Sequence, residues 1–155
     1  MIKLSRRQSG ATLVEMAIIA PVFLLVLVAL IELSIMFFAT LTMQYAVREG
    51  ARFAITGQST SDGYASNQQR YATVIAKMRD NSMGMYDRLN TRISVNGTTY
   101  QQKAYNNGMF GGAGSINVIQ LDCEWPVITP LISTFFTDGK YSFTVAATMR
   151  NEIFP

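Results

Sequence analysis

The stretch ATLVEMAIIAPVFLLVLVALIELSIMFFATLTMQYAV, residues 11–47, decides the architecture of this 155-residue chain. It contains two charged side chains, Glu15 and Glu32, and the 16 residues from Met16 to Ile31 carry no charge. A helix needs about 20 apolar residues to cross the hydrocarbon core of a bilayer. Residues 16–43 exceed that length with one acid inside. The sequence therefore predicts a membrane-spanning helix.

We expect this helix to run from Ala11 to about Ile55, because no Gly or Pro interrupts residues 22–49. At about 1.5 Å per residue, such a helix would be ~68 Å long, roughly twice the bilayer core. It would therefore project from the membrane and carry the rest of the chain. Pro21 removes one backbone hydrogen bond and is expected to kink the helix.

The excess positive charge lies before this helix. Lys3, Arg6 and Arg7 are three of the 13 basic residues, and the other 10 balance 10 acidic residues. Basic residues flanking a membrane span remain in the cytoplasm. We therefore expect the N-terminus in the cytoplasm and the C-terminal domain outside it, which in a bacterium means the periplasm or beyond. The remaining basic residues are scattered among acidic ones, which gives no indication of nucleic-acid binding.

Residue types argue against catalysis. The chain has no His, so His-based triads and His metal sites are excluded. We expect no catalytic residue, no metal and no cofactor, and hence a protein that is not an enzyme. Cys123 is the sole cysteine. It is expected to be buried as a small hydrophobic residue, with an intermolecular disulfide as the alternative.

The residues at the N-terminal end of the helix have several possible interpretations. The apolar run is too long for a cleaved secretory signal, so the helix is either a plain anchor or a processed one. Glu15 could sit at headgroup level near the helix N-terminus, where the helix dipole favours an anion. Alternatively, a peptidase cuts after Gly10, and Glu15 neutralises the new amino group of Ala11 on a neighbouring subunit.

Glu32 and the end of the span have two interpretations each. Glu32 lies either near the periplasmic interface or against a partner helix in an assembly. Arg48, Glu49 and Arg52 begin the exterior, either as a hydrated stop or as a packing surface. Gly50, four residues after a small alanine, would allow close helix approach.

The rest of the chain predicts a small α+β domain. Polar residues 57–66 read as a linker, and residues 67–89 have helical apolar periodicity. Residues 92–100 predict a hairpin turning at Asn96-Gly97, and residues 106–115 predict a Gly-rich loop. Residues 116–127 and 140–150 alternate like strands, joined by an apolar crossover. Asp122 and Glu124 share one strand face, where solvated edge residues are favoured over a Ca²⁺ or acid–base site.

The N-terminal segment resembles the prepilin signal of type IV-like pilins, with its basic leader, Gly10, Glu15 and uninterrupted apolar helix. More closely, the chain resembles the TadE-like family, which comprises minor pilins or pseudopilins of the tight-adherence (Tad/Flp) pilus. Five stretches carry the resemblance: residues 9–25, 31–33, 46–54, 125–131 and 146–152. The second and third of these include Glu32 and the motif Arg48, Glu49, Gly50 and Arg52.

The resemblance implies a precursor in the inner membrane that a prepilin peptidase cuts after Gly10. It implies a role in pilus assembly, initiation or tip structure, and hence in adhesion. The implied partners are the major Flp pilin, TadF-like minor pilins, the inner-membrane assembly platform and membrane lipid. We expect a leader over residues 1–10, the helix over 11–56 and the domain over 57–155. The alternative is a membrane-anchored periplasmic adhesin or interaction module outside any filament.

Overall fold

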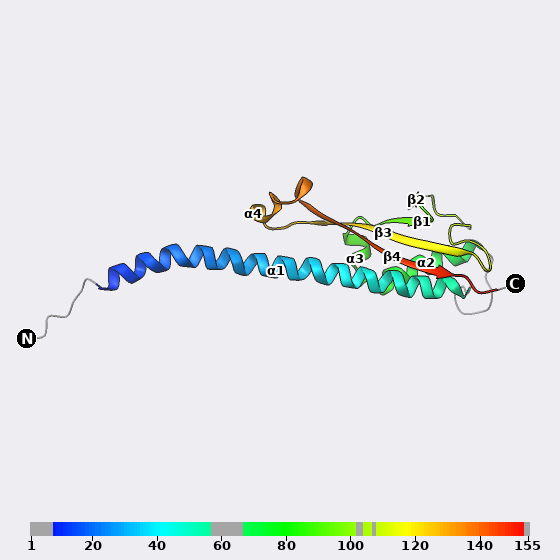
Figure 1. The fold of residues 1–155 in the computed structure, drawn as a ribbon, viewed down its shortest axis with the longest axis horizontal. Coiled ribbons are helices and arrows are strands. Elements are labelled where there is room, and N and C mark those ends of the chain that lie inside the picture. The colour runs from blue at the N-terminus through cyan, green and yellow to red at the C-terminus, as the bar shows by residue number, and fades with distance from the viewer. Residues whose placement is uncertain (1–7, 57–66, 102–103, 107, 154–155) are drawn as a thin grey trace, which may run out of the picture.

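The computed structural model describes residues 8–56, 67–101, 104–106 and 108–153 of the chain. Residues 1–7 of the expected leader and the expected linker over residues 57–66 therefore lie outside the described residues. The described part is one long helix with an antiparallel sheet and short helices gathered along its second half (Figure 1). The predicted α+β class is confirmed.

The elements follow one another in an order that places helices first and strands later. They are α1 (Gln8–Ile55), α2 (Asn67–Asp80), α3 (Met85–Arg88), β1 (Arg92–Val95), β2 (Thr98–Tyr100), β3 (Ile116–Pro126), α4 (Pro130–Ser133), the 3₁₀ turn η2 (Thr137–Gly139) and β4 (Lys140–Arg150). We refer to residues 67–153 as the C-terminal domain.

Helix α1 is continuous over 48 residues, as predicted, and its two halves have different surroundings. Its second half packs beside α2 and β4 (Figure 1). The side chains buried there recur every three or four residues, which is one face of a helix. They include Glu32, Met36, Ala39, Met43, Val47, Ala51 and Ala54. The first half is largely exposed.

The expected single helix over residues 67–89 is broken into two. Met83 and Gly84 have φ angles of 51° and 78°, both in the left-handed region. Two consecutive residues in that conformation cannot continue a right-handed helix. The chain therefore turns after α2 and restarts as the short α3. Tyr86 and Leu89 still reach the core, so the apolar pattern was read correctly although the helix is interrupted.

In the described part of the chain the sheet has four strands in the order β2-β1-β3-β4, with every neighbouring pair antiparallel. The predicted β1–β2 hairpin is confirmed, and both turn residues, Asn96 and Gly97, have positive φ. The predicted inward face of β3 is also confirmed, because its residues 117, 119, 121, 123 and 125 are buried and alternate with less buried ones.

The expected crossover between the last two strands is instead a hairpin connection. Pro126 pairs with Lys140, so β3 and β4 are sheet neighbours over their full length. Residues 127–139, which we name the hairpin tip, contain α4 and η2. The tip extends beyond the sheet towards the exposed half of α1 (Figure 1). The apolar character that suggested a crossover therefore belongs to a projecting loop.

Replacing Gly50 with Leu should destabilise the packing of α1 on α2. A Cβ atom at Gly50 would lie 2.3 Å from Cγ of the fully buried Met78 and 2.6 Å from its Cε. Overpacking of this kind costs about 1–3 kcal/mol, and we expect a lower melting temperature by circular dichroism in detergent. Gly112→Leu is the control, because nothing lies within 4 Å of a Cβ there. Equal melting temperatures for the two variants would contradict the prediction.

Candidate membrane-anchoring and assembly site

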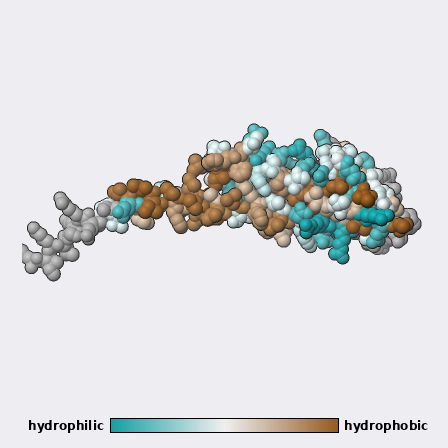
Figure 2. Space-filling view, viewed as in Figure 1, coloured by the Kyte–Doolittle hydropathy of each residue, from teal (hydrophilic) through white to brown (hydrophobic). Residues whose placement is uncertain are grey.

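The first half of α1 is an apolar helix exposed on all sides. Large side chains from Leu13 to Ile31 point in every direction around it, and Figure 2 shows this half as a nearly continuous hydrophobic surface. Residues 12–31 form about 30 Å of helix, which matches the hydrocarbon core of a bilayer. By length and composition α1 can cross a membrane, and it fits a single-pass anchor.

Gly10 and Glu15 both lie within α1. The helix begins at Gln8, so Gly10 is in its first turn, with nothing within 4 Å of where a Cβ would be. Glu15 is exposed and lies beyond that first turn. The favourable effect of a helix dipole on an anion fades within one turn. In the uncut chain the helix dipole therefore does little to stabilise the carboxylate of Glu15.

Pro21 lies inside α1 without ending it. Figure 1 shows the helix bending in its blue, N-terminal part. A proline removes one helical hydrogen bond and its ring pushes against the preceding turn, which is the usual cause of such a bend. The bend aims the start of α1, with Glu15, in a direction different from that of the packed second half.

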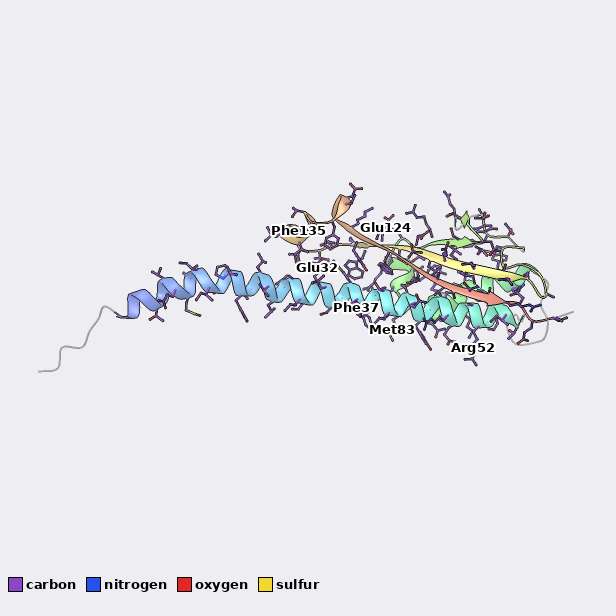
Figure 3. The ribbon with its side chains drawn as sticks, in the orientation of Figure 1. Glu32, Phe37, Arg52, Met83, Glu124 and Phe135 are labelled. Carbon is purple, nitrogen blue, oxygen red and sulfur yellow. The ribbon has the colours of Figure 1, made fainter. Side chains whose placement is uncertain are left out.

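Glu32 is the first described residue of α1 that is buried, and it is 5% exposed. Its Oε1 accepts a hydrogen bond from the backbone N–H of Ile128 at 2.5 Å. The N–H of Thr129 lies 3.3 Å from Oε1 and 3.2 Å from Oε2. Figure 3 shows Glu32 pointing towards the hairpin tip that carries Phe135. The carboxylate thus binds the tip of its own chain, a contact that neither sequence-based interpretation included.

A largely apolar cavity of about 150 Å³ lies beside this contact, between α1 and the hairpin tip. Its lining consists of Val28, Ile31, Glu32, Ile35, Trp125, Ile128 and Thr129. The indole N–H of Trp125 is buried and has no acceptor among the described residues. Trp125 is the single tryptophan of the chain, so it offers a natural spectroscopic reporter for this region.

The motif at residues 48–52 lies in the part of α1 that packs against the C-terminal domain. Gly50 is buried against Met78, whereas Arg48 and Arg52 are exposed. Glu49 and Arg52 line an open polar hollow together with Lys77 of α2. Arg48 lies about 25 Å along the helix from Ile31, where the exposed half ends. The motif is therefore distant from the exposed, bilayer-length segment of α1.

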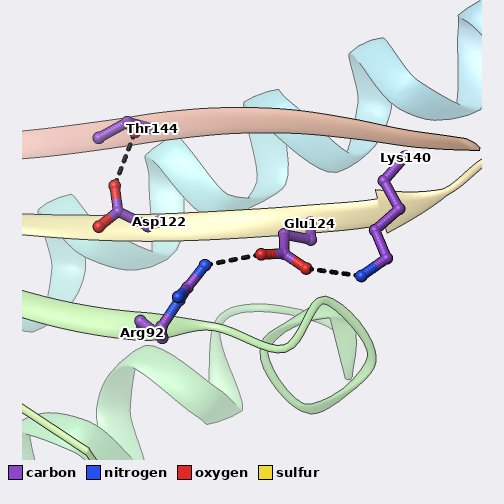
Figure 4. Close-up of polar contacts among 5 residues, drawn as sticks. All are labelled: Arg92, Asp122, Glu124, Lys140 and Thr144. Carbon is purple, nitrogen blue, oxygen red and sulfur yellow. Dashed lines mark hydrogen bonds and ion pairs between the residues drawn. The ribbon is translucent and has the colours of Figure 1, made fainter. Parts of the chain in front are cut away.

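The acidic residues of β3 are held in pairs on the outer face of the sheet (Figure 4). Glu124 lies 2.6 Å from Nη2 of Arg92 and 3.2 Å from Nζ of Lys140. Asp122 accepts a hydrogen bond of 2.7 Å from the hydroxyl of Thr144. Exposed pairs of this kind contribute little to stability. No group of three or more metal-ligating side chains occurs in the described part of the chain.

Sequence reasoning missed the contact between Glu32 and the hairpin tip. A signal for the tip was available, because residues 125–137 carry no charge and Pro130 follows Thr129 at the start of α4. Proline is favoured at the first position of a helix, and the N–H groups of the residues before that position take no part in the hydrogen bonds of the helix. The acceptor lies 96 residues earlier in the chain, and no local pattern points to it.

Replacing Glu32 with Ala should release the hairpin tip from α1. The N–H groups of Ile128 and Thr129 would lose their charged acceptor, and a hydrogen bond to a charged group contributes about 1.5–3 kcal/mol. We expect faster hydrogen–deuterium exchange at these two amides, measured by mass spectrometry in detergent. Ser34→Ala is the control, since that hydroxyl bonds only within α1, to the Leu30 carbonyl. Unchanged exchange in the Glu32 variant would refute the contact.

Cys123 should resist thiol reagents while the domain is folded. It is buried in the core, and burial raises the pKa of its thiol to about 11. The thiol therefore remains protonated at pH 7 to 9, and the reactive thiolate is scarce. We expect slow labelling by maleimide in native protein and fast labelling in denaturant. Rapid labelling of the native protein, or an intermolecular disulfide in purified protein, would contradict this burial.

The comparisons with known proteins agree with the N-terminal geometry. The family model described as TadE-like protein matches residues 10–52, a segment that runs from Gly10 through Glu15 and Glu32 to Arg52. The match covers less than half of the chain, and the C-terminal stretches of the resemblance lie outside it. No curated protein and no solved structure matches the chain. The resemblance to the TadE-like family is thus confirmed over residues 10–52.

Proposed function

We propose that this chain is a minor pilin or pseudopilin of the Tad pilus, processed after Gly10 and active in pilus assembly, initiation or tip structure. Its chemistry is protein–protein contact, and it is not an enzyme. The precursor sits in the inner membrane with its N-terminus in the cytoplasm and its C-terminal domain in the periplasm. The basic leader residues support this orientation, because positive flanks remain in the cytoplasm.

The observation that carries the proposal is an exposed apolar stripe on α1 beyond the bilayer-length segment. Phe37, Leu41 and Tyr45 are 69%, 56% and 54% exposed and lie on the side of α1 away from the buried stripe. Figure 3 shows Phe37 on the side of the helix opposite the hairpin tip. A helix that served only as an anchor would need no apolar surface about 20 Å beyond its span. Helices packed side by side in a filament would cover it.

Glu15 supports the same proposal through its charge. It is exposed on α1 and forms no ion pair with any residue that the structure describes. A carboxylate in an apolar surrounding requires a partner of opposite charge. Cleavage after Gly10 would create a positive amino group on Ala11, four residues away. In a filament, Glu15 of one subunit would be neutralised by the Ala11 amino group of its neighbour. Glu15 of that neighbour would in turn be neutralised by the amino group of the next subunit.

The cleavage position also suits a peptidase. Gly10 has open space around it and weakens the first turn of α1, since glycine is the least favourable residue in a helix apart from proline. The turn can therefore open into an enzyme groove at low cost. The proposed partners are a prepilin peptidase, the major Flp pilin, TadF-like minor pilins and the inner-membrane assembly platform.

The processing step is tested by sequencing the N-terminus of the protein recovered from sheared pili. We expect Ala11 as the first residue. Gly10→Val should leave the precursor uncut, because a branched side chain would replace the small residue before the scissile bond. Recovery of an N-terminus at Met1 or Ile2 in assembled pili would refute the processing.

The filament role is tested with Glu15→Ala in cells that lack the native chain. We expect the processed variant to remain in the inner membrane and to be missing from sheared pili on immunoblots. Glu152→Ala, which removes an exposed carboxylate of the C-terminal domain, is the control and should enter pili normally. Normal adhesion by the Glu15 variant, with the chain absent from wild-type pili, would instead favour a membrane-anchored periplasmic adhesin.

A further inference from the structure

The hairpin tip, residues 127–139, exposes apolar side chains at the end of the domain nearest the bare half of α1. Ile128, Leu131 and Phe135 are 72%, 55% and 85% exposed. The uncharged run of residues 125–137 spans almost the whole tip, and Asp138 is its only charged residue. Figure 2 shows the hydrophobic surface of α1 running on into this end of the domain. Such a surface on a loop requires a partner that is apolar.

The depth of the tip along α1 indicates which partner this is. The bilayer-length bare segment ends at Ile31, and the next residue, Glu32, binds the backbone of the tip. Val28, one helical turn further into the bare segment, lines the same cavity as Ile128 and Thr129. With α1 crossing a bilayer, the base of the tip therefore lies at the membrane surface. Its apolar side chains lie at the level where headgroups meet acyl chains.

The internal hydrogen bonding of the tip suits this location. Backbone groups that enter a water-poor region must find partners within the protein. The N–H groups of Ile132 and Ser133 bond to the Thr129 carbonyl, and those of Phe135 and Phe136 bond within the tip. The hydroxyls of Ser133 and Thr134 donate to carbonyls three residues earlier. Pro130 has no N–H group, and Glu32 accepts from the two residues before it.

We infer that the hairpin tip is a second membrane contact, which inserts Ile128, Leu131 and Phe135 into the lipid interface beside α1. Side chains of this kind enter an interface to a depth of about 5–10 Å. The contact rests on the membrane anchor and does not depend on the pilus role. It would hold the C-terminal domain in one orientation on the bilayer, because a helix alone leaves the domain free to rotate about the helix axis.

The test places an environment-sensitive fluorophore on the tip of the full-length chain. Phe135→Cys is made in a Cys123→Ala background, labelled with NBD and reconstituted at one chain per phosphatidylcholine nanodisc. We expect blue-shifted emission that is quenched by lipids carrying a nitroxide near the top of the acyl chain. Met83→Cys, labelled identically, is the matched control, since Met83 is 76% exposed and lies away from the tip (Figure 3). Its emission should remain that of a fluorophore in water.

Leu131→Cys in the unaltered Cys123 background repeats the measurement and covers the case in which Cys123→Ala does not fold. The buried Cys123 thiol is not expected to take the label in the folded chain. Quenching at both tip positions and not at residue 83 would support the inference. Water-like emission at the tip would overturn it. Emission that is shifted but not quenched by nitroxide lipids would also overturn it, because protein and not lipid would then cover the tip.

Discussion

The position of Glu32 on α1 organises the rest of the structure, because the helix changes its surroundings there. Before it lies about 30 Å of largely exposed helix, and after it the domain covers one face continuously. An ionised side chain at that boundary would be costly in an apolar setting without partners. Two backbone N–H groups of the hairpin tip provide them. The carboxylate therefore fixes where the domain begins along the helix.

The two acids of the long apolar stretch bracket the proposed span. Glu15 and Glu32 are separated by about 26 Å along the helix, close to the thickness of a hydrocarbon core. Each acid would lie near one membrane surface, but their means of neutralisation differ. Glu32 is satisfied within its own chain, whereas Glu15 has no partner in the described residues. One acid is therefore structural, and the other is available for a contact between subunits.

Much of the fold follows from local patterns in the sequence. The continuous apolar run predicted α1, the alternation of residues 116–127 predicted the buried face of β3, and Asn96-Gly97 predicted the turn of the β1–β2 hairpin. Of the two errors, the first has a local cause and the second depends on residues distant in the sequence. Consecutive left-handed residues at Met83 and Gly84 split a helix whose apolar pattern is unbroken. The pairing of β3 with β4 turned an expected crossover into a projecting tip.

The candidate site was harder to predict because α1 is apolar on more than one face. Met36, Ala39 and Met43 pack on the domain, while Phe37, Leu41 and Tyr45 on the other side are exposed. Hydropathy assigns both sets to the same membrane span, and helical periodicity cannot separate two apolar faces. Only the folded domain reveals that one face is already occupied. The other face stays exposed and apolar although the core of the domain is already complete. The sequence alone could not distinguish this exposed face from the buried one. An assembly that packs this helix against others is the simplest physical reason for such a surface.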